Sequence, residues 1–372
     1  MSHYYIMSGF ETLGLPINNY NIRKYVKLYI NNEKDKLPPL LKDIPITDWD
    51  VSDVTNMDGL FRNALYFDEP LNWDVSKVTS MVEMFYNARE FNSPLTSTNP
   101  DTGEIEPWNV SNVTNMAGMF RAANKFNQPL NWGVSKVTDM STMFYQATIF
   151  DQPLNWDVSN VRNMAYMFCL AKAFTGPLTW NGGPWNVSRV IIMAGMFDQA
   201  ESFDQPLDWN VSNVTNMSLM FYEATSFNSP LTWTNPDTGE IEPWNVSNVT
   251  NMIWMFFGAT KFNQDLSTWN ISPETDTTSM FDDTDFKLLN DKLPSKAQFY
   301  ATVAGLKDLG LYHYLDAETI KDLGQYIGEI PDFKKTYTDS DGNIKKIQGG
   351  GRKRRTKRRK SGKRKTRSHR KQ

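Results

Sequence analysis

A unit of 24 residues recurs nine times along the chain, and this repetition constrains the fold more than any other feature of the sequence. A clear copy, WDVSKVTSMVEMFYNAREFNSPL, runs from Trp73 to Leu95. Self-similarity at this period is the signature of a solenoid, in which stacked units share one continuous core. It favours an extended binding surface over a catalytic pocket. The anchoring tryptophans are Trp49, Trp73, Trp108, Trp132, Trp156, Trp185, Trp209, Trp244 and Trp269.

Apolar residues at helical spacing predict a helix in the second half of each unit. Between Val78 and Ala88 the apolar positions are separated by steps of 3, 3, 1 and 3, which places them on one face of a helix of about three turns. A serine precedes this stripe in every unit, and we expect its side-chain oxygen to cap the helix. The nine serines are Ser52, Ser76, Ser111, Ser135, Ser159, Ser188, Ser212, Ser247 and Ser272.

The first residues of each unit predict a strand. Leu71, Trp73 and Val75 alternate with Asn72 and Asp74, which is the period-2 pattern of a half-buried strand with its tryptophan in the core. A proline stands just before most of these stretches and marks where the strand begins. Nine stacked strands at a spacing of roughly 4.8 Å give a parallel ladder of about 40 Å.

The repeated string W-x-V-S-x-V-T-x-M-x-x-M-F-x-x-A-x-x-F-x-x-P-L is seen at Trp209 to Leu231 and at Trp244 to Leu266. It resembles the BspA-like leucine-rich repeat family, which occurs in bacterial surface proteins and is expanded in protists and large DNA viruses. The resemblance covers residues 47 to about 282. It implies an α/β solenoid of leucine-rich-repeat type, with nine strand–helix units, that serves adhesion or protein binding. It implies no catalytic residues.

A short polar residue usually follows the last phenylalanine of each unit. Asn and Asp side chains accept hydrogen bonds from backbone N–H groups at turns. We therefore expect these residues to form a ladder that satisfies turn backbone from one coil to the next, the alternative being a row of solvated turn residues. The positions are Asp68, Asn92, Asn127, Asp151, Asp204, Asn228 and Asn263, with Thr175 as the exception.

The sequence on either side of the repeats differs in character and suggests five segments. A helix expected from Asn21 to Asn32 would close the first open face of the core. Helices are also expected at Ser295–Leu309 and Asp316–Ile327, and a hairpin around Asp341. The segments are 1–46, an N-terminal helical cap; 47–282, the solenoid; 283–332, a C-terminal helical cap; 333–348, a hairpin or linker; and 349–372, a disordered basic tail.

Two insertions with nearly the same sequence interrupt the array. Residues 97–107 read STNPDTGEIEP and residues 233–243 read WTNPDTGEIEP, and a smaller glycine-rich insertion spans residues 180–184. The Asp-Thr-Gly sequence predicts the turn of a projecting hairpin. Insertions in solenoids often lie on the face that binds a partner. The alternative is surface decoration that the fold tolerates.

The polar residues of the predicted strands form a second candidate surface. Because Trp73 and its neighbours face the core, the residues between them face outward. The ribbon is polar and acidic, so it would suit a basic or hydrogen-bonding protein surface; the alternative is an ordinary solvated sheet face. The candidate partner-binding residues are Asp50, Asn72, Asp74, Asn131, Asn155, Asp157, Asp208 and Asn210.

Charge is unevenly distributed along the chain. Residues 352–372 hold 14 Lys and Arg and no acid, whereas the other 351 residues hold 25 basic and 42 acidic residues. Such a tail binds nucleic acid and other polyanions by counterion release, or directs a protein to the nucleus. The alternative is that it lies on its own acidic body. The candidate polyanion-binding residues are Arg352, Lys353, Arg354, Arg355, Lys357, Arg358, Arg359 and Lys360.

The residue types needed for catalysis or metal binding do not cluster. The three histidines, His3, His313 and His369, all lie outside the repeats, and Cys169 follows a core Met–Phe pair as a packing thiol would. Residues 336–347 resemble a calcium loop but lack its final glutamate. We therefore expect no catalytic residue, no cofactor and no metal site.

The sequence thus predicts a non-enzymatic scaffold for protein–protein recognition. One alternative is a nucleic-acid-binding or virion-associated protein that acts through its basic tail. This tail, a run of glycines followed by basic residues, resembles the ends of many proteins of large DNA viruses. Another is a surface adhesin. No signal peptide and no membrane span are apparent, which favours an intracellular protein, nuclear or virion-associated, over a secreted one.

Overall fold

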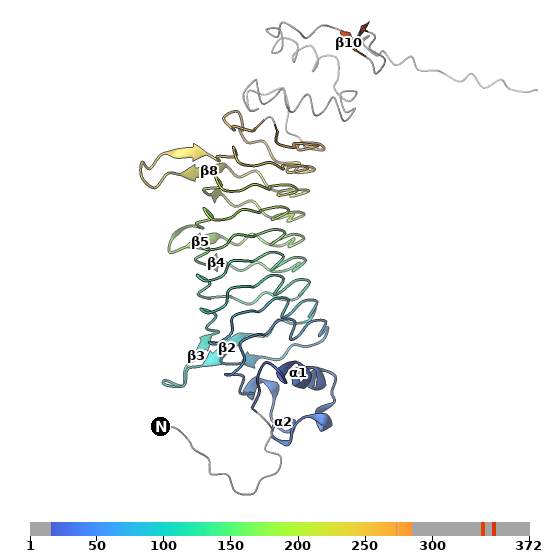
Figure 1. The fold of residues 1–372 in the computed structure, drawn as a ribbon, viewed down its shortest axis with the longest axis vertical. Coiled ribbons are helices and arrows are strands. Elements are labelled where there is room, and N and C mark those ends of the chain that lie inside the picture. The colour runs from blue at the N-terminus through green and yellow to red at the C-terminus, as the bar shows by residue number, and fades with distance from the viewer. Residues whose placement is uncertain (1–15, 273, 285–335, 339–343, 347–372) are drawn as a thin grey trace, which may run out of the picture. The chain divides into compact units, whose positions relative to one another are not determined.

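A computed structural model of the chain describes residues 16–272 and 274–284 in full and the backbone of residues 336–338 and 344–346 (Figure 1). The chain divides into two compact units, Met1–Tyr312 and His313–Gln372. The first contains the repeats. In the second, β10 (Thr336–Thr338) pairs antiparallel with β11 (Ile344–Lys346), which confirms the expected hairpin. The helices expected at Ser295–Leu309 and Asp316–Ile327 and the tail 349–372 lie outside the described residues.

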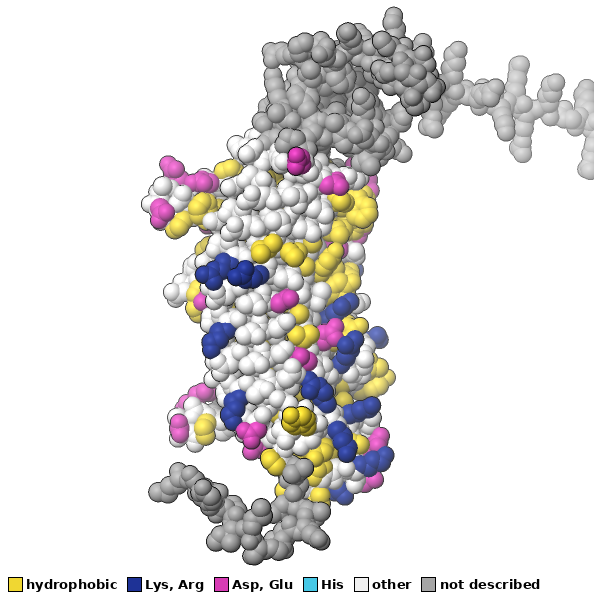
Figure 2. Space-filling model, viewed as in Figure 1, with side chains coloured by type: hydrophobic (Ala, Val, Ile, Leu, Met, Phe, Trp, Pro, Cys, Tyr) yellow, Lys and Arg dark blue, Asp and Glu magenta, His cyan; other side chains and the backbone are white. Residues whose placement is uncertain are grey.

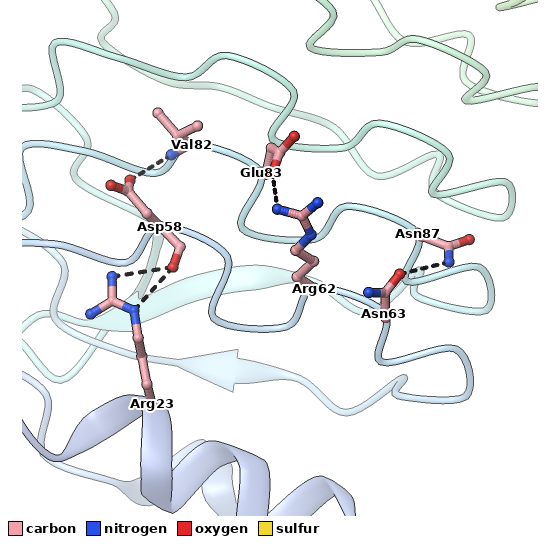
Figure 3. Close-up of polar contacts among 7 residues, drawn as sticks. All are labelled: Arg23, Asp58, Arg62, Asn63, Val82, Glu83 and Asn87. Atoms are coloured by element: carbon pink, nitrogen blue, oxygen red, sulfur yellow. Dashed lines mark hydrogen bonds and ion pairs between the residues drawn. The ribbon is translucent and has the colours of Figure 1, made fainter.

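The residues before the repeats cover the first coil. The helix expected from the spacing of Ile22, Val26 and Tyr29 is α1 (Ile22–Ile30), and all three of these side chains are buried. The Tyr29 ring meets Trp49 edge to face at 5.5 Å between ring centroids. Arg23 donates to the carbonyl oxygen of Asp58 in the first coil (Figure 3). The other elements of this segment are the 3-10 turns η1 (Lys34–Lys36) and η2 (Ile46–Asp48) and the short helix α2 (Pro39–Lys42).

The nine repeats stack as successive coils of one solenoid (Figure 1). A parallel ladder one residue wide runs through all of them, because one residue of each coil bridges to its equivalent in the next. The prediction of tandem stacked units is therefore confirmed. The bridged residues are Asn56, Ser80, Asn115, Asp139, Asn163, Ile192, Asn216, Asn251 and Asp276.

The predicted helix of each unit is wrong: within the described residues the repeats contain only turns and short strands. In a helix each N–H would bond within its own coil. Here the N–H groups of Glu83 and Phe85 donate to the next coil, at 2.8 Å each, while those of Met84 and Tyr86 close turns to residues three positions earlier. The stripe of 3, 3, 1 and 3 fits successive tight turns as well as it fits a helix.

Left-handed backbone at two positions of each coil, four residues apart, keeps these turns from becoming a helix. In the second coil Glu83 has φ 52° and Asn87 has φ 58°; in the third coil the equivalent residues are Gly118 at 63° and Ala122 at 55°. An α-helix of L-residues has no place for positive φ. Each of these residues points its N–H toward the neighbouring coil, so the strained positions make the bonds that join the solenoid.

The predicted serine caps are also wrong, since there is no helix for them to cap. Ser76 instead occupies the second position of a tight turn in which the N–H of Val78 donates to the carbonyl of Val75 at 2.9 Å. The Ser76 N–H donates to the side chain of Asp74 at 2.9 Å. Serine is therefore a turn residue here, and the preceding Asp or Asn supplies the side-chain acceptor.

Strands form at three places rather than in every unit, and they are shorter than expected. Each begins with the leucine that follows a proline. The parallel pairs are β1 (Leu71–Asn72) with β2 (Leu95–Thr98), β4 (Leu154–Asn155) with β5 (Leu178–Trp180), and β7 (Leu207–Asp208) with β8 (Leu231–Thr234). The second strand of each pair turns back into an antiparallel partner: β3 (Ile105–Pro107), β6 (Gly183–Pro184) and β9 (Ile241–Pro243).

Three columns of aromatic rings form the core. Neighbouring indole rings from Trp73 to Trp269 stack 6.3–6.5 Å apart. Two phenylalanine columns stack at 5.2–5.8 Å and 5.9–6.0 Å. Several indole N–H groups donate to backbone carbonyls of the preceding coil, as that of Trp156 does to Leu130 at 2.9 Å, whereas those of Trp49 and Trp269, in the first and last coils, have no partner among the described residues. The tryptophans are core residues, as predicted.

The Asn and Asp ladder expected after the late phenylalanine is confirmed. The N–H of each residue donates to the side-chain oxygen of its equivalent in the coil before, at 2.7–2.9 Å. The Thr175 N–H donates to Asp151 in the same way, but Thr175 has no side-chain carbonyl to accept the next N–H. The ladder is therefore interrupted between Thr175 and Asp204. The side chains therefore hold turn backbone that water would otherwise have to satisfy.

Candidate partner-binding surface

The three insertions project as hairpins from the same side of the solenoid (Figure 1). The two long ones repeat each other bond for bond: Asn99 N–H donates to Glu104 at 2.8 Å, and Asn235 N–H donates to Glu240 at 2.8 Å. Gly103 and Gly239 supply the left-handed residue of each turn, with φ 74° and 73°. The hairpin predicted from Asp-Thr-Gly is therefore confirmed, in the same conformation twice.

The two long hairpins each carry an exposed isoleucine among acids, and the small hairpin carries an exposed tryptophan. Ile105 and Ile241 are both 73% exposed, and Trp180 on the small hairpin is 43% exposed. Figure 2 shows hydrophobic and acidic side chains together on two lobes that project to the left of the coils. Exposed apolar groups mark interaction sites when they gather on one face of a protein.

Three predicted site residues hold the bases of these hairpins. Asn72 donates through its amide to the Thr98 hydroxyl at 2.7 Å, and Asn155 accepts from the Asn181 N–H at 3.1 Å. Asp208 accepts from the hydroxyl and the N–H of Thr234, the hydroxyl lying at 2.7 Å. These side chains fix the angle at which each hairpin leaves the coil. As residues that touch a partner they remain a prediction.

Four others accept hydrogen bonds within their own turn. Asp50, Asp74, Asp157 and Asn210 each take the N–H of the serine two residues later, at 2.9–3.1 Å. This bond stabilises the turn that follows the tryptophan. Asn131, the remaining member of the ribbon, is exposed. None of the eight is buried, as the alternation predicted, but seven of them already serve the fold. The tail candidates Arg352 to Lys360 lie outside the described residues.

Cys169 lies inside the solenoid, as predicted for a packing thiol. It is 3% exposed and burial raises the pKa of its thiol, so the reactive thiolate is disfavoured. The carboxyl of Asp198 interacts with this thiol, and burial raises the pKa of that carboxyl to about 6. Among the described residues no group of three or more His, Cys, Asp or Glu side chains could hold a metal ion.

Sequence reasoning missed a column of alternating arginines and tyrosines in the first four coils, at the position that follows the central phenylalanine. The Arg62 guanidinium lies 4.9 Å from the ring centre of Tyr86, and Arg121 lies between Tyr86 and Tyr145, at 5.3 Å and 4.8 Å from their ring centres. On the expected helices these residues would fall outside the apolar stripe, where nothing predicts a contact between them. In stacked coils equivalent positions lie directly above one another, which brings these groups together.

Comparison with known protein families identifies the repeats. The family described as "Mycoplasma protein of unknown function, DUF285" matches residues 41–103, 98–183, 155–238 and 233–296. The chain belongs to this family. The four DUF285 matches overlap and together span every coil, which agrees with the ladder that runs through all nine. No curated protein and no solved structure was found to match. Within the described part of this DUF285 protein, no helix is long and apolar enough to span a membrane.

Proposed function

We propose that this DUF285 protein is a non-enzymatic scaffold that recognises another protein through its projecting hairpins. The observation that carries the proposal is the repetition of one hairpin, with the same internal bonds and the same exposed isoleucine, at Ile105 and Ile241. Five coils separate the two copies, so at roughly 4.8 Å per coil their bases lie about 24 Å apart. The BspA-like character of the repeat string, a type used in adhesion and protein binding, supports the same function.

The hairpins favour a partner that combines basic groups with apolar pockets. The side chains around Ile105 include Asp101, Glu104 and Glu106, and those around Ile241 are the same types. An apolar anchor surrounded by charge is a common arrangement in protein interfaces. A partner with two equivalent epitopes would bind both hairpins at once and gain avidity without any further contact.

Capture from native lysate with matched variants tests the proposal. The informative variant replaces both hairpin anchors, Ile105→Asp and Ile241→Asp. The matched control is Ile149→Asp, which changes an isoleucine that is 44% exposed but lies outside the hairpins. We expect proteins captured by the wild type and by the control to be lost from the double variant. Equal capture by all three chains would contradict a role for the hairpins.

A second candidate function rests on the charge of residues 352–372, which hold 14 Lys and Arg and no acid. Such a tail would bind nucleic acid and leave the solenoid as a spacer. Deleting residues 349–372 separates the two functions. Partner capture that survives the deletion supports the hairpins, whereas loss of all binding, after a steep dependence on salt in the full chain, supports the tail.

A further inference from the structure

A polar pocket of about 500 Å³ opens on the column of arginines and tyrosines, away from the hairpins. Three successive coils contribute to it: Tyr86 and Arg89 come from the second, Arg121 and Asn124 from the third, and Tyr145 from the fourth. Figure 2 shows Lys and Arg side chains gathered at the right-hand edge of the coils nearest the N-terminal cap, opposite the hairpin lobes.

The arginines near this pocket differ in how their charge is balanced. Arg62 forms an ion pair with Glu83 at 2.6 Å (Figure 3), and Lys125 forms one with Glu90 at 3.4 Å. Arg121 makes no ion pair with any side chain that the structure describes, and the Arg89 guanidinium donates to the neutral side chain of Asn87 at 2.9 Å. The pocket is lined by two uncompensated cations and by no carboxylate.

This imbalance is unexpected for the chain as a whole. Residues 1–351 hold 42 acidic and 25 basic residues, so carboxylates are plentiful. Stacking between two tyrosine rings explains how Arg121 is held, because the face of an aromatic ring attracts a guanidinium. It does not explain why two like charges share a pocket without a counter-charge. A guanidinium fixed by its faces keeps its N–H edge available for a bidentate acceptor.

We propose that the pocket binds a doubly charged oxyanion, the phosphate monoester group of a larger ligand. Arg121 would grip two of its oxygens edge-on, and Arg89 would neutralise the second charge from the neighbouring coil. The amide side chains of Asn87 and Asn124 complete a polar rim that suits an oxyanion better than an apolar group. The site lies apart from the hairpins, so it is independent of the protein-binding function proposed above.

Calorimetric titration of the full chain with inorganic phosphate, and separately with sulfate and acetate at constant ionic strength, tests this site. We expect a saturable binding event for phosphate or sulfate, in addition to any binding by the tail, and we expect it to weaken at least tenfold in Arg121→Gln. Arg121→Lys keeps the charge but loses the bidentate edge, and its affinity should fall between that of the wild type and that of Arg121→Gln. The control is Arg189→Gln, whose guanidinium is exposed and donates to Asn160 at another position of the repeat.

The tail is present in every chain, so any phosphate that it binds cancels in the comparison. Arg89→Gln provides a second variant that leaves the stacked column untouched, should Arg121→Gln fail to fold. Equal phosphate and sulfate binding by Arg121→Gln, Arg89→Gln and Arg189→Gln would overturn the site. Acetate binding as tight as phosphate binding would overturn its assignment to a doubly charged group. The hairpin variant Ile105→Asp with Ile241→Asp should bind phosphate normally, which keeps the two proposals separable.

Discussion

Removing one side chain from the Asn ladder should loosen a single junction between coils. The Asn127 side-chain oxygen accepts from the N–H of Asp151 at 2.9 Å and from the amide of Gln152 at 3.0 Å. Asn127→Ala removes this acceptor and therefore both hydrogen bonds. Each such bond contributes about 0.5–1.5 kcal/mol net, so the pair should contribute about 2 kcal/mol to the junction. Because each coil contacts only its neighbours, the loss should remain local.

Amide hydrogen exchange measures this loss residue by residue. A loss of about 2 kcal/mol corresponds to roughly 30-fold faster exchange, and we expect it at Asp151 and in the two coils that share the junction. The N–H of Asn228, which makes the equivalent bond to Asp204 at 2.8 Å in another part of the ladder, should exchange as in the wild type. The control is Asn131→Ala, which removes an exposed asparagine from the same region. If Asp151 exchanged no faster in Asn127→Ala than in this control, the ladder would not be holding the coils together.

Three further substitutions test the packing of the coils, each by urea denaturation. Thr175→Asn restores the missing side-chain carbonyl and should raise the free energy of unfolding by about 0.5–1 kcal/mol; no gain would mean that the interruption is filled by water. Gly176→Ala should cost about 1–3 kcal/mol, because its Cβ would lie 2.5 Å from the carbonyl oxygen of Gln152, whereas Gly133→Ala meets no atom within 4 Å and should be neutral. Asp198 has a folded pKa of about 6, above its ordinary value of 3.8. Ionisation of this carboxyl therefore destabilises the fold, and stability should rise as pH falls from above 6 toward 4. Asp198→Asn should be more stable than the wild type at pH 7 and should flatten that rise; an unchanged pH profile would assign the rise to other groups.

The sequence was sufficient to predict which residues are buried and that the units stack. Trp73, Phe85 and Phe91 recur at fixed offsets, and a period of 24 residues admits one shared core. The ladder that contains Asn127 was also predictable, because asparagine side chains accept hydrogen bonds from backbone N–H groups at turns. These inferences depend on position within the repeat and not on the local path of the backbone.

The local path could not be read from the same pattern. The spacing from Val78 to Ala88 fits a helix, and the deciding bonds, such as Phe85 N–H to the Met119 carbonyl at 2.8 Å, join residues that are 34 positions apart in sequence. One signal was available: glycine at Gly59, Gly118 and Gly195, at equivalent positions of three repeats, where glycine would destabilise a helix. The Arg121 pocket was missed for the same reason, since it exists only once the coils are in register.

The direction of the backbone bonds has a consequence for how such a chain is assembled and how it evolves. A coil cut out as a peptide would keep its tight turns but lose the neighbour that accepts the N–H groups of residues such as Glu83 and Phe85. Each coil of the solenoid therefore adopts its conformation on the coil beside it, which supplies the acceptors for its N–H groups. Whole coils can then be gained or lost during evolution, whereas a partial coil would leave backbone N–H groups without acceptors. The nearly identical segments at residues 97–107 and 233–243 are the expected result of duplicating a block of whole coils.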